Sequence, residues 1–153
     1  MKTRIGITSG ELKGIGSEII LKILADTSFT ESFELIPVID KNIITSLSAE
    51  SGIKINKDFE FIAPEITAGD DYSLSSLKKS LSLLKENRID ALVTMPILKN
   101  SLKGYSGHTE FLEDFDGRQS AMMMCGKAFR CILITNHLPV RKIANAITGN
   151  LIV

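Results

Sequence analysis

Short apolar runs alternate along this chain with stretches of helical periodicity, and this alternation limits the possible folds more than any other feature. Runs at Arg4–Ser9, Phe33–Asp40 and Ala91–Thr94 predict buried strands, and Phe59–Ala63 predicts a weaker one. Helical spacing separates them. Strands that alternate with helices predict an α/β layered fold, with a mostly parallel sheet and flanking helices.

Two amphipathic helices are expected between these strands, and Ser17 is a suitable N-cap for the first. The apolar positions of the first helix are Ile19, Ile20, Ile23 and Leu24. The second helix should end near Asn87, and its apolar positions are Leu74, Leu77, Leu81 and Leu84.

The pattern changes toward the end of the chain. Apolar runs at Ala121–Cys125 and Ala128–Thr135 flank a Gly-Lys pair and predict a hairpin, with Met122–Met124 in its core. Pro139–Ile147 predicts a last helix.

Composition excludes several classes of protein. A chain of 153 residues with 44% hydrophobic residues suits one soluble domain. Eighteen basic and eighteen acidic residues leave no net charge, so a nucleic-acid partner is not expected. No apolar run has the length of a membrane span. Cys125 and Cys131 match no redox or zinc spacing, so a reduced, cytoplasmic setting is expected.

The chain has two histidines, and each lies where a predicted element begins or ends. His108 follows a glycine and precedes Thr109 at the start of a helix, so it could hydrogen-bond a substrate or cap that helix. His137 ends an apolar run, so it could bind a metal or be a satisfied histidine at a strand end. Spacing alone leaves both alternatives open.

Two further segments should lie at the carboxyl ends of strands, where open α/β sheets bind ligands. The loop Gly10–Gly16 leads into a helix, so Gly14 and Gly16 could bring backbone N–H groups to an anion, or could simply form a tight turn. Lys99 follows a Thr-Met-Pro turn and could neutralise a phosphate or be solvated.

Five segments together resemble the 4-hydroxythreonine-4-phosphate dehydrogenase family of pyridoxal phosphate biosynthesis. In the family's order they are Thr8-Ser9-Gly10-Glu11 with Gly14-Ile15-Gly16, Asp90 to Pro96 with Lys99, Gly107-His108-Thr109-Glu110-Phe111, Met122-Met123-Met124, and Thr135-Asn136-His137-Leu138-Pro139. The resemblance covers essentially the whole chain.

The resemblance implies a fold and a set of roles. The fold is like that of isocitrate and isopropylmalate dehydrogenases, with two α/β lobes and a cleft between them. Residues 1–118 would form the first lobe, and 119–153 the hairpin and helix that begin the second. His108 and Thr109 would contact substrate, and His137 would bind a divalent metal.

The implied chemistry is oxidation, with decarboxylation, of 4-phosphohydroxy-L-threonine. It would use NAD and a divalent ion such as Zn, Mg or Co, in a homodimer. The chain departs from the family pattern at Leu12 and Ser17, where prolines are usual, and at Met95, where glycine is usual. It also lacks the family's later histidine segments, so it resembles a truncated front half.

Other functions remain open at this point. The chain could be a small α/β binding module or an inactive fragment, or a paralogue acting on a phosphorylated threonate or erythronate. If the chain alone turned over substrate, other metal ligands would be needed, and Glu11, Glu110 and Asp114 are the candidates.

Overall fold

The computed structural model describes residues 1–105, 107–135 and 138–149. It divides the chain into two compact units, Met1–Ser106 and Gly107–Val153. Each unit is described by itself. The lobe boundary expected at residue 118 stays a prediction. It concerns the lobes of a complete enzyme, whereas the two units are compact parts of this chain.

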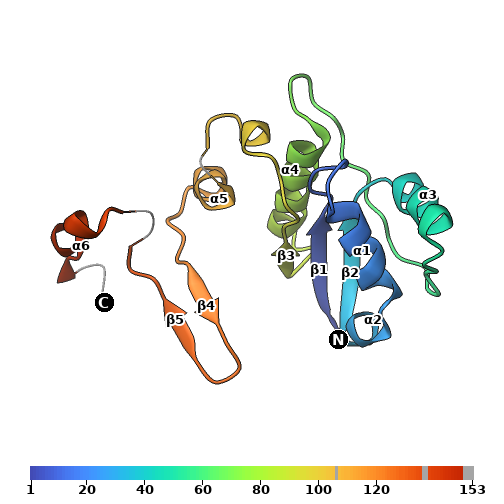
Figure 1. Cartoon of the computed structure of the whole chain (residues 1–153), viewed down its shortest axis with the longest axis horizontal. Coiled ribbons are helices and arrows are strands. Elements are labelled where there is room, and N and C mark those ends of the chain that lie inside the picture. Colours follow the sequence, from blue (N-terminus) through green and yellow to red (C-terminus); the bar gives the residue numbers. More distant parts are fainter. Residues whose placement is uncertain (106, 136–137, 150–153) are drawn as a thin grey trace. The chain divides into compact units, whose positions relative to one another are not determined.

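Unit 1 is built on a parallel sheet of β1 (Thr3–Thr8), β2 (Phe33–Val38) and β3 (Ala91–Val93), in the order β2-β1-β3 (Figure 1). The register pairs Thr8 with Val38 on one side of β1 and Ile7 with Val93 on the other. The expected α/β class and its parallel sheet are therefore confirmed.

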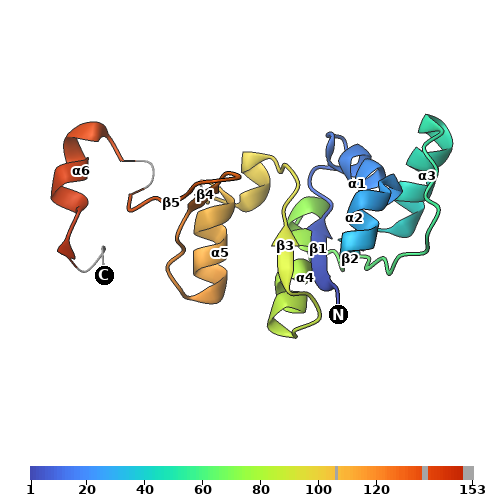
Figure 2. The ribbon, with the colours of Figure 1, turned by 90° about the horizontal axis from the view of Figure 1, so that it is seen from below.

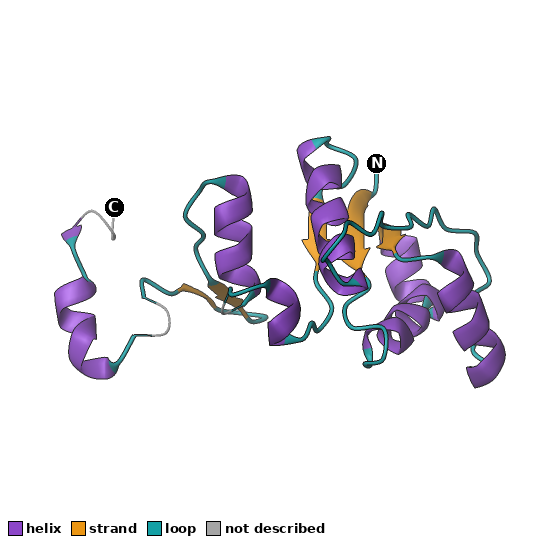
Figure 3. Cartoon of the chain, turned by 90° about the horizontal axis from the view of Figure 1, so that it is seen from above, coloured by secondary structure: helices purple, strands orange, loops and turns teal. Residues whose placement is uncertain are grey.

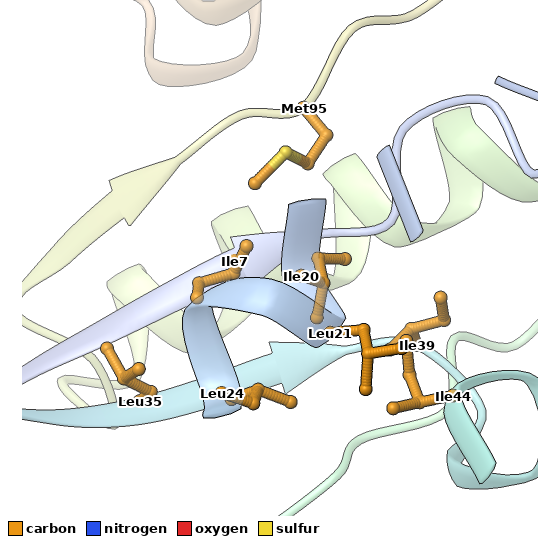
Figure 4. Close-up of a cluster of buried hydrophobic side chains, with 8 residues drawn as sticks. All are labelled: Ile7, Ile20, Leu21, Leu24, Leu35, Ile39, Ile44 and Met95. Carbon is orange, nitrogen blue, oxygen red and sulfur yellow. The ribbon is translucent and has the colours of Figure 1, made fainter. Parts of the chain in front are cut away.

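One face of this sheet is covered by helix α1 (Gly16–Ala25). Alternate residues of the strands point to this face, where Ile7 and Leu35 pack with Ile20 and Leu24 of the helix (Figure 4). Met95 belongs to the same buried cluster. The branched side chains at a spacing of three and four residues are the reason that α1 forms and packs here.

The opposite face is covered by helix α4 (Tyr72–Lys85), so α1 and α4 lie on opposite sides of β1 (Figure 2). Ile36 and Val38 of β2 pack there against Leu83. Gly6 of β1 lies close to this layer, because a Cβ there would lie 2.5 Å from Cδ1 of the buried Ile89 side chain. The sheet is thus the middle layer of three.

Two expectations for unit 1 are wrong. Ser17 is not the N-cap of α1, because the helix begins at Gly16 and Ile15 occupies the cap position. Phe59–Ala63 forms no strand. This segment gives β2 one backbone bond, from Ile62 N–H to the carbonyl of Pro37 (3.0 Å), and Pro37 has no N–H to return.

Three elements of unit 1 were not expected from the sequence. They are α2 (Thr27–Ser32), α3 (Lys41–Ser51) and the short 3₁₀ helix η1 (Lys99–Leu102). The side chains of Asp26 and Asp40 accept hydrogen bonds at the starts of α2 and α3. An aspartate before a helix is a signal that the sequence did carry.

Unit 2 holds α5 (His108–Asp116), the antiparallel hairpin of β4 (Met123–Cys125) and β5 (Arg130–Ile132), and α6 (Val140–Ala146) (Figure 3). The hairpin and both helices match expectation. The methionines do not form a core, because Met123 and Met124 are 48% and 59% exposed. A two-stranded hairpin offers no second layer that could cover them.

One ion pair fastens β1 to the start of β3. The guanidinium of Arg4 donates two hydrogen bonds to the carboxylate of Asp90 (2.6 and 3.1 Å), and the Arg4 backbone N–H donates a third (2.8 Å). The Arg4 hydrogen bonds lower the pKa of Asp90 from 3.8 to about 2. The carboxylate is therefore charged through most of the acid range.

We expect Asp90→Asn to make unfolding less sensitive to acid. A carboxyl whose pKa is depressed by folding stabilises the fold above its unfolded pKa, near 3.8, and loses that effect as the pH falls through about 2. Wild type should therefore lose more stability than the variant between these values, and the variant should be less stable at pH 7. Thermal unfolding at several pH values measures both, and parallel curves would contradict the assignment.

Candidate functional site

The candidate site in unit 1 lies where β1 and β3 end. Two of the four segments singled out in the sequence meet there, the loop Gly10–Gly16 and the turn Thr94–Pro96. The backbone N–H of Glu11 donates to the carbonyl of Pro96 (2.9 Å), and the N–H of Met95 donates to the hydroxyl of Thr8 (2.9 Å). These bonds join the first two motifs of the resemblance into one surface.

Two glycines allow this close approach. Gly10 has a φ of +63°, and a Cβ there would lie 2.6 Å from both the Met95 Cβ and the Pro96 carbonyl oxygen. At Gly16 a Cβ would lie 2.5 Å from the carbonyl oxygen of Ser9 and 3.3 Å from the Met95 Cβ. Met95, which replaces the family's usual glycine, fits because its side chain enters the core.

The first turn of α1 has unused hydrogen-bonding capacity. Ile15 makes no side-chain cap bond to the helix. The Ser17 hydroxyl is buried and has no hydrogen-bond partner in the part of the chain that the structure describes. A hollow of about 430 Å³ lies beside this turn, lined by Leu12, Ser17 and one side of α3. Uncapped helix starts and free hydroxyls suit an anionic or hydroxylated ligand.

Lys99 begins η1, and only its backbone is described, so the role of its side chain stays a prediction. The other end of η1 is anchored by Asp70, whose carboxylate is 2% exposed and pairs with Lys103 and Lys78. The hydrogen bonds from Lys103, and then from Lys78, hold the pKa of Asp70 below its ordinary value. Because Lys103 ends η1, this cluster fastens the segment that Lys99 begins.

His108 and Thr109 are the first two residues of α5 in unit 2, and both are half-buried. Gly107 occupies the cap position without a side-chain cap bond, so the alternative that His108 caps the helix is wrong. Burial lowers the pKa of His108 below 6.5, because it penalises the charged imidazolium. A neutral imidazole at pH 7 can both donate and accept a hydrogen bond.

A divalent metal does not fit the described residues by themselves. Among them, no group of three or more His, Cys, Asp or Glu side chains lies close enough to hold an ion. Catalytic metal sites commonly use about three protein ligands. The expected ligand, His137, lies outside the described residues. Glu11, Glu110 and Asp114 form no such group either.

Three hydroxyl residues shape this site, and one of them, Ser76, lies in none of the sequence motifs. Thr8, Ser9 and Ser76 are all buried. The Ser76 hydroxyl accepts from the backbone N–H of Ser9 (2.9 Å) and donates to the Val38 carbonyl (2.6 Å). A serine inside a helix carries no spacing signal, so only its position in the fold reveals the contact.

Comparison with known families now identifies the fold's relatives. The model of the family described as "Pyridoxal phosphate biosynthetic protein PdxA" matches residues 16–153. The chain belongs to this family. Among the described residues, no helix of this PdxA-family chain is long and apolar enough to cross a membrane.

Curated relatives match along nearly the whole chain. A "4-hydroxythreonine-4-phosphate dehydrogenase" of Bacteroides thetaiotaomicron is 30% identical over 99% of the chain and 50% of its own length. A "Putative D-threonate 4-phosphate dehydrogenase" of Clostridium botulinum is 27% identical over 96% of the chain and 53% of its own length. The chain therefore spans about half the length of the curated relatives it matches.

A solved structure supports the fold independently. The crystal structure titled as a 4-hydroxythreonine-4-phosphate dehydrogenase from Burkholderia phymatum superposes with a TM-score of 0.85 and 22% identity. It covers 99% of this chain and 55% of that chain. At this identity the likeness shows a shared α/β fold.

We expect Gly16→Ala to destabilise the protein by roughly 1–3 kcal/mol, the usual cost of overpacking a well-packed site. Its Cβ would lie 2.5 Å from a backbone oxygen, which cannot swing away as a side chain can. Gly14→Ala is the control, since its Cβ would lie 3.3 Å from its nearest neighbour, the Glu11 carbonyl oxygen, instead of 2.5 Å. Urea unfolding measures both, and equal losses would contradict the close approach at Gly16.

We also expect the pKa of His108 to lie below 6.5, as measured by NMR titration of the imidazole protons. Folding then disfavours the imidazolium, so stability is complete above the unfolded pKa and falls as the pH drops below it. His108→Gln, which cannot titrate, should lose less stability between pH 7 and 5. A midpoint at or above 6.5 would contradict burial of the ring.

Proposed function

We propose that this chain forms the front half of the catalytic unit of a metal- and NAD-dependent dehydrogenase that acts on a phosphorylated hydroxy acid. The observation that carries the proposal is the joining of the Gly10–Gly16 loop to the Thr94–Pro96 turn by direct hydrogen bonds. Two segments far apart in the sequence thereby form one ligand-facing surface in a chain of the PdxA family.

The proposed roles are assigned within each unit separately. The start of α1 at Gly16 offers backbone N–H groups to a phosphate, and Lys99 supplies a positive charge. Gly14 contributes to the shape of the loop, since its own N–H donates to the carbonyl of Glu11 (3.0 Å). His108 and Thr109 hydrogen-bond the hydroxyl and carboxylate groups of the substrate. A neutral His108 can accept a proton from a hydroxyl while donating a hydrogen bond elsewhere.

The cofactors of this proposal are NAD and a divalent ion such as Zn, Mg or Co. When bound, the ion would supply Lewis-acid activation of the substrate hydroxyl, and NAD would supply a hydride acceptor. His137 is the proposed ligand from this chain. The remaining ligands and much of the nicotinamide surface would come from the part of the family's length that this chain does not span.

The preferred substrate is 4-phosphohydroxy-L-threonine, after the name of the 30%-identical Bacteroides relative. D-Threonate 4-phosphate is the second candidate, after the Clostridium relatives. The two substrates differ in the group beside the reacting hydroxyl, an amine in one and a hydroxyl in the other. We propose the isocitrate dehydrogenase-like two-lobed arrangement and a cytoplasmic location for the complete enzyme.

The exposed side chains of unit 2 support a homodimer and a further layer of protein in the complete enzyme. Phe129 is 71% exposed and Ile132 is 55% exposed, beside the two exposed methionines of β4. An apolar surface of this kind is commonly an interface. We therefore expect the purified chain to self-associate, which sedimentation would detect as a mass above that of the monomer.

The activity is tested with the chain alone and with the chain completed by the second half of the Bacteroides relative. We expect the chain alone to reduce no NAD with either substrate, because a single histidine does not hold a catalytic metal. The completed protein should oxidise 4-phosphohydroxy-L-threonine, and His108→Ala should raise KM or lower kcat without weakening NAD binding. Turnover by the chain alone would overturn the front-half assignment, and a completed, folded protein that oxidises neither substrate would overturn the dehydrogenase assignment.

A further inference from the structure

The end of the central strand β1 is held by a side chain from a distant helix. Thr8 is the last residue of β1 and pairs with Val38, the last residue of β2. The next backbone donor is the N–H of Ser9, and it meets the hydroxyl of Ser76 at 2.9 Å rather than a carbonyl of β2. That hydroxyl donates in turn to the carbonyl of Val38 at 2.6 Å.

The Ser76 hydroxyl thus stands between the N–H of Ser9, the first residue after β1, and the carbonyl of Val38, the last residue of β2. It satisfies both groups while it lets the two strands separate, so β1 can leave the sheet at Ser9. On the other side of β1 the Thr8 hydroxyl accepts a hydrogen bond from the N–H of Met95 (2.9 Å). Buried backbone groups need such partners, since an unsatisfied one is costly.

Ser9, whose N–H is held by Ser76, is also the residue whose carbonyl lies against the start of α1. A Cβ on Gly16 would lie 2.5 Å from the Ser9 carbonyl oxygen, so the first turn of α1 rests directly on Ser9. Gly10, the next residue, packs equally closely on Met95 and Pro96. A shift of Ser9 therefore moves the whole Gly10–Gly16 loop.

We infer that Ser76 is a positioning residue, which holds the Ser9–Gly16 loop and the start of α1 in the geometry that receives the phosphate of the substrate. This inference rests on the proposed phosphate-binding role of the loop. Ser76 is 0% exposed and acts through Ser9, so it does not itself touch the ligand. Its contribution is to orient backbone N–H groups before the anion arrives.

Helix α4 supplies matched controls. Ser80 is also 0% exposed, but its hydroxyl donates to the carbonyl of Ser76 within the same helix (2.8 Å). Ser75 is 3% exposed, and its hydroxyl has no partner among the described residues. Replacing either serine by alanine removes the same atom from the same helix without releasing Ser9.

The test follows backbone amides of the 153-residue chain by NMR during titration with inorganic phosphate. In wild type, Ser80→Ala and Ser75→Ala we expect the amide signals of Gly16 and Ser17 to shift on phosphate binding, with similar affinity in all three proteins. In Ser76→Ala the affinity should fall by roughly tenfold or more, because a small displacement of a binding group has a large effect. Hydrogen exchange at Ser9 should also become faster in that variant alone.

Ser76→Cys keeps a weaker hydrogen-bonding group in nearly the same space and should give an intermediate affinity, so the series can be read even if the alanine variant folds poorly. Phosphate binding that is unchanged in folded Ser76→Ala would overturn the positioning role and leave the proposed function intact. An equal loss in Ser80→Ala would also overturn it, as a general effect on α4. If wild type shows no shift at Gly16 or Ser17, the proposed phosphate role of the loop fails, and the inference fails with it.

Discussion

The carboxyl end of β1 places a constraint on everything around it. A central strand in a parallel sheet has neighbours on both sides, and where it leaves them its backbone groups lose their partners. Here the hydroxyls of Thr8 and Ser76 take over on the two sides. The loop that follows can then pass close to the turn after β3, which only glycine allows at positions 10 and 16. The candidate site lies at this point, where the chain leaves the sheet after β1.

Helix α4 packs on the sheet with several buried serines, some of whose hydroxyls hydrogen-bond to backbone groups. Its serines at 73, 75, 76 and 80 are all buried, although a helix that packs on a sheet normally presents aliphatic side chains there. Ser76 and Ser80 are satisfied by backbone carbonyls, and Ser76 alone reaches the end of the sheet. Small hydroxyl side chains let the helix lie close to the strand ends while they supply partners for the backbone.

The two units differ in how completely each buries its own apolar side chains. Unit 1 has a three-layered core on both faces of its sheet, with clusters around Ile7 and around Val38. Unit 2 leaves large apolar side chains of its hairpin exposed. The chain spans about half the length of the curated relatives it matches.

The sequence by itself determined the α/β class, the three parallel strands, α1, α4 and the hairpin, because apolar periodicity is a local property that burial then enforces. Five ordered segments also indicated the PdxA family. Predictions from local patterns were wrong where the structure of a segment depended on contacts with a distant segment. Phe59–Ala63 has strand composition, but its neighbour Pro37 cannot donate to it. Met122–Met124 has core composition, but no second layer lies over it in this unit.

The tertiary structure alone decided which polar groups meet. Ser17 looked like a helix cap, yet the cap position of α1 is Ile15, two residues earlier, and Gly16 lies against Ser9. Ser76 lies 67 positions from Ser9, and nothing in its own surroundings along the chain indicates that contact. A hydrogen bond between distant segments depends on the path of the whole chain, whereas the tendency to form a strand or helix is already present in a few neighbouring residues.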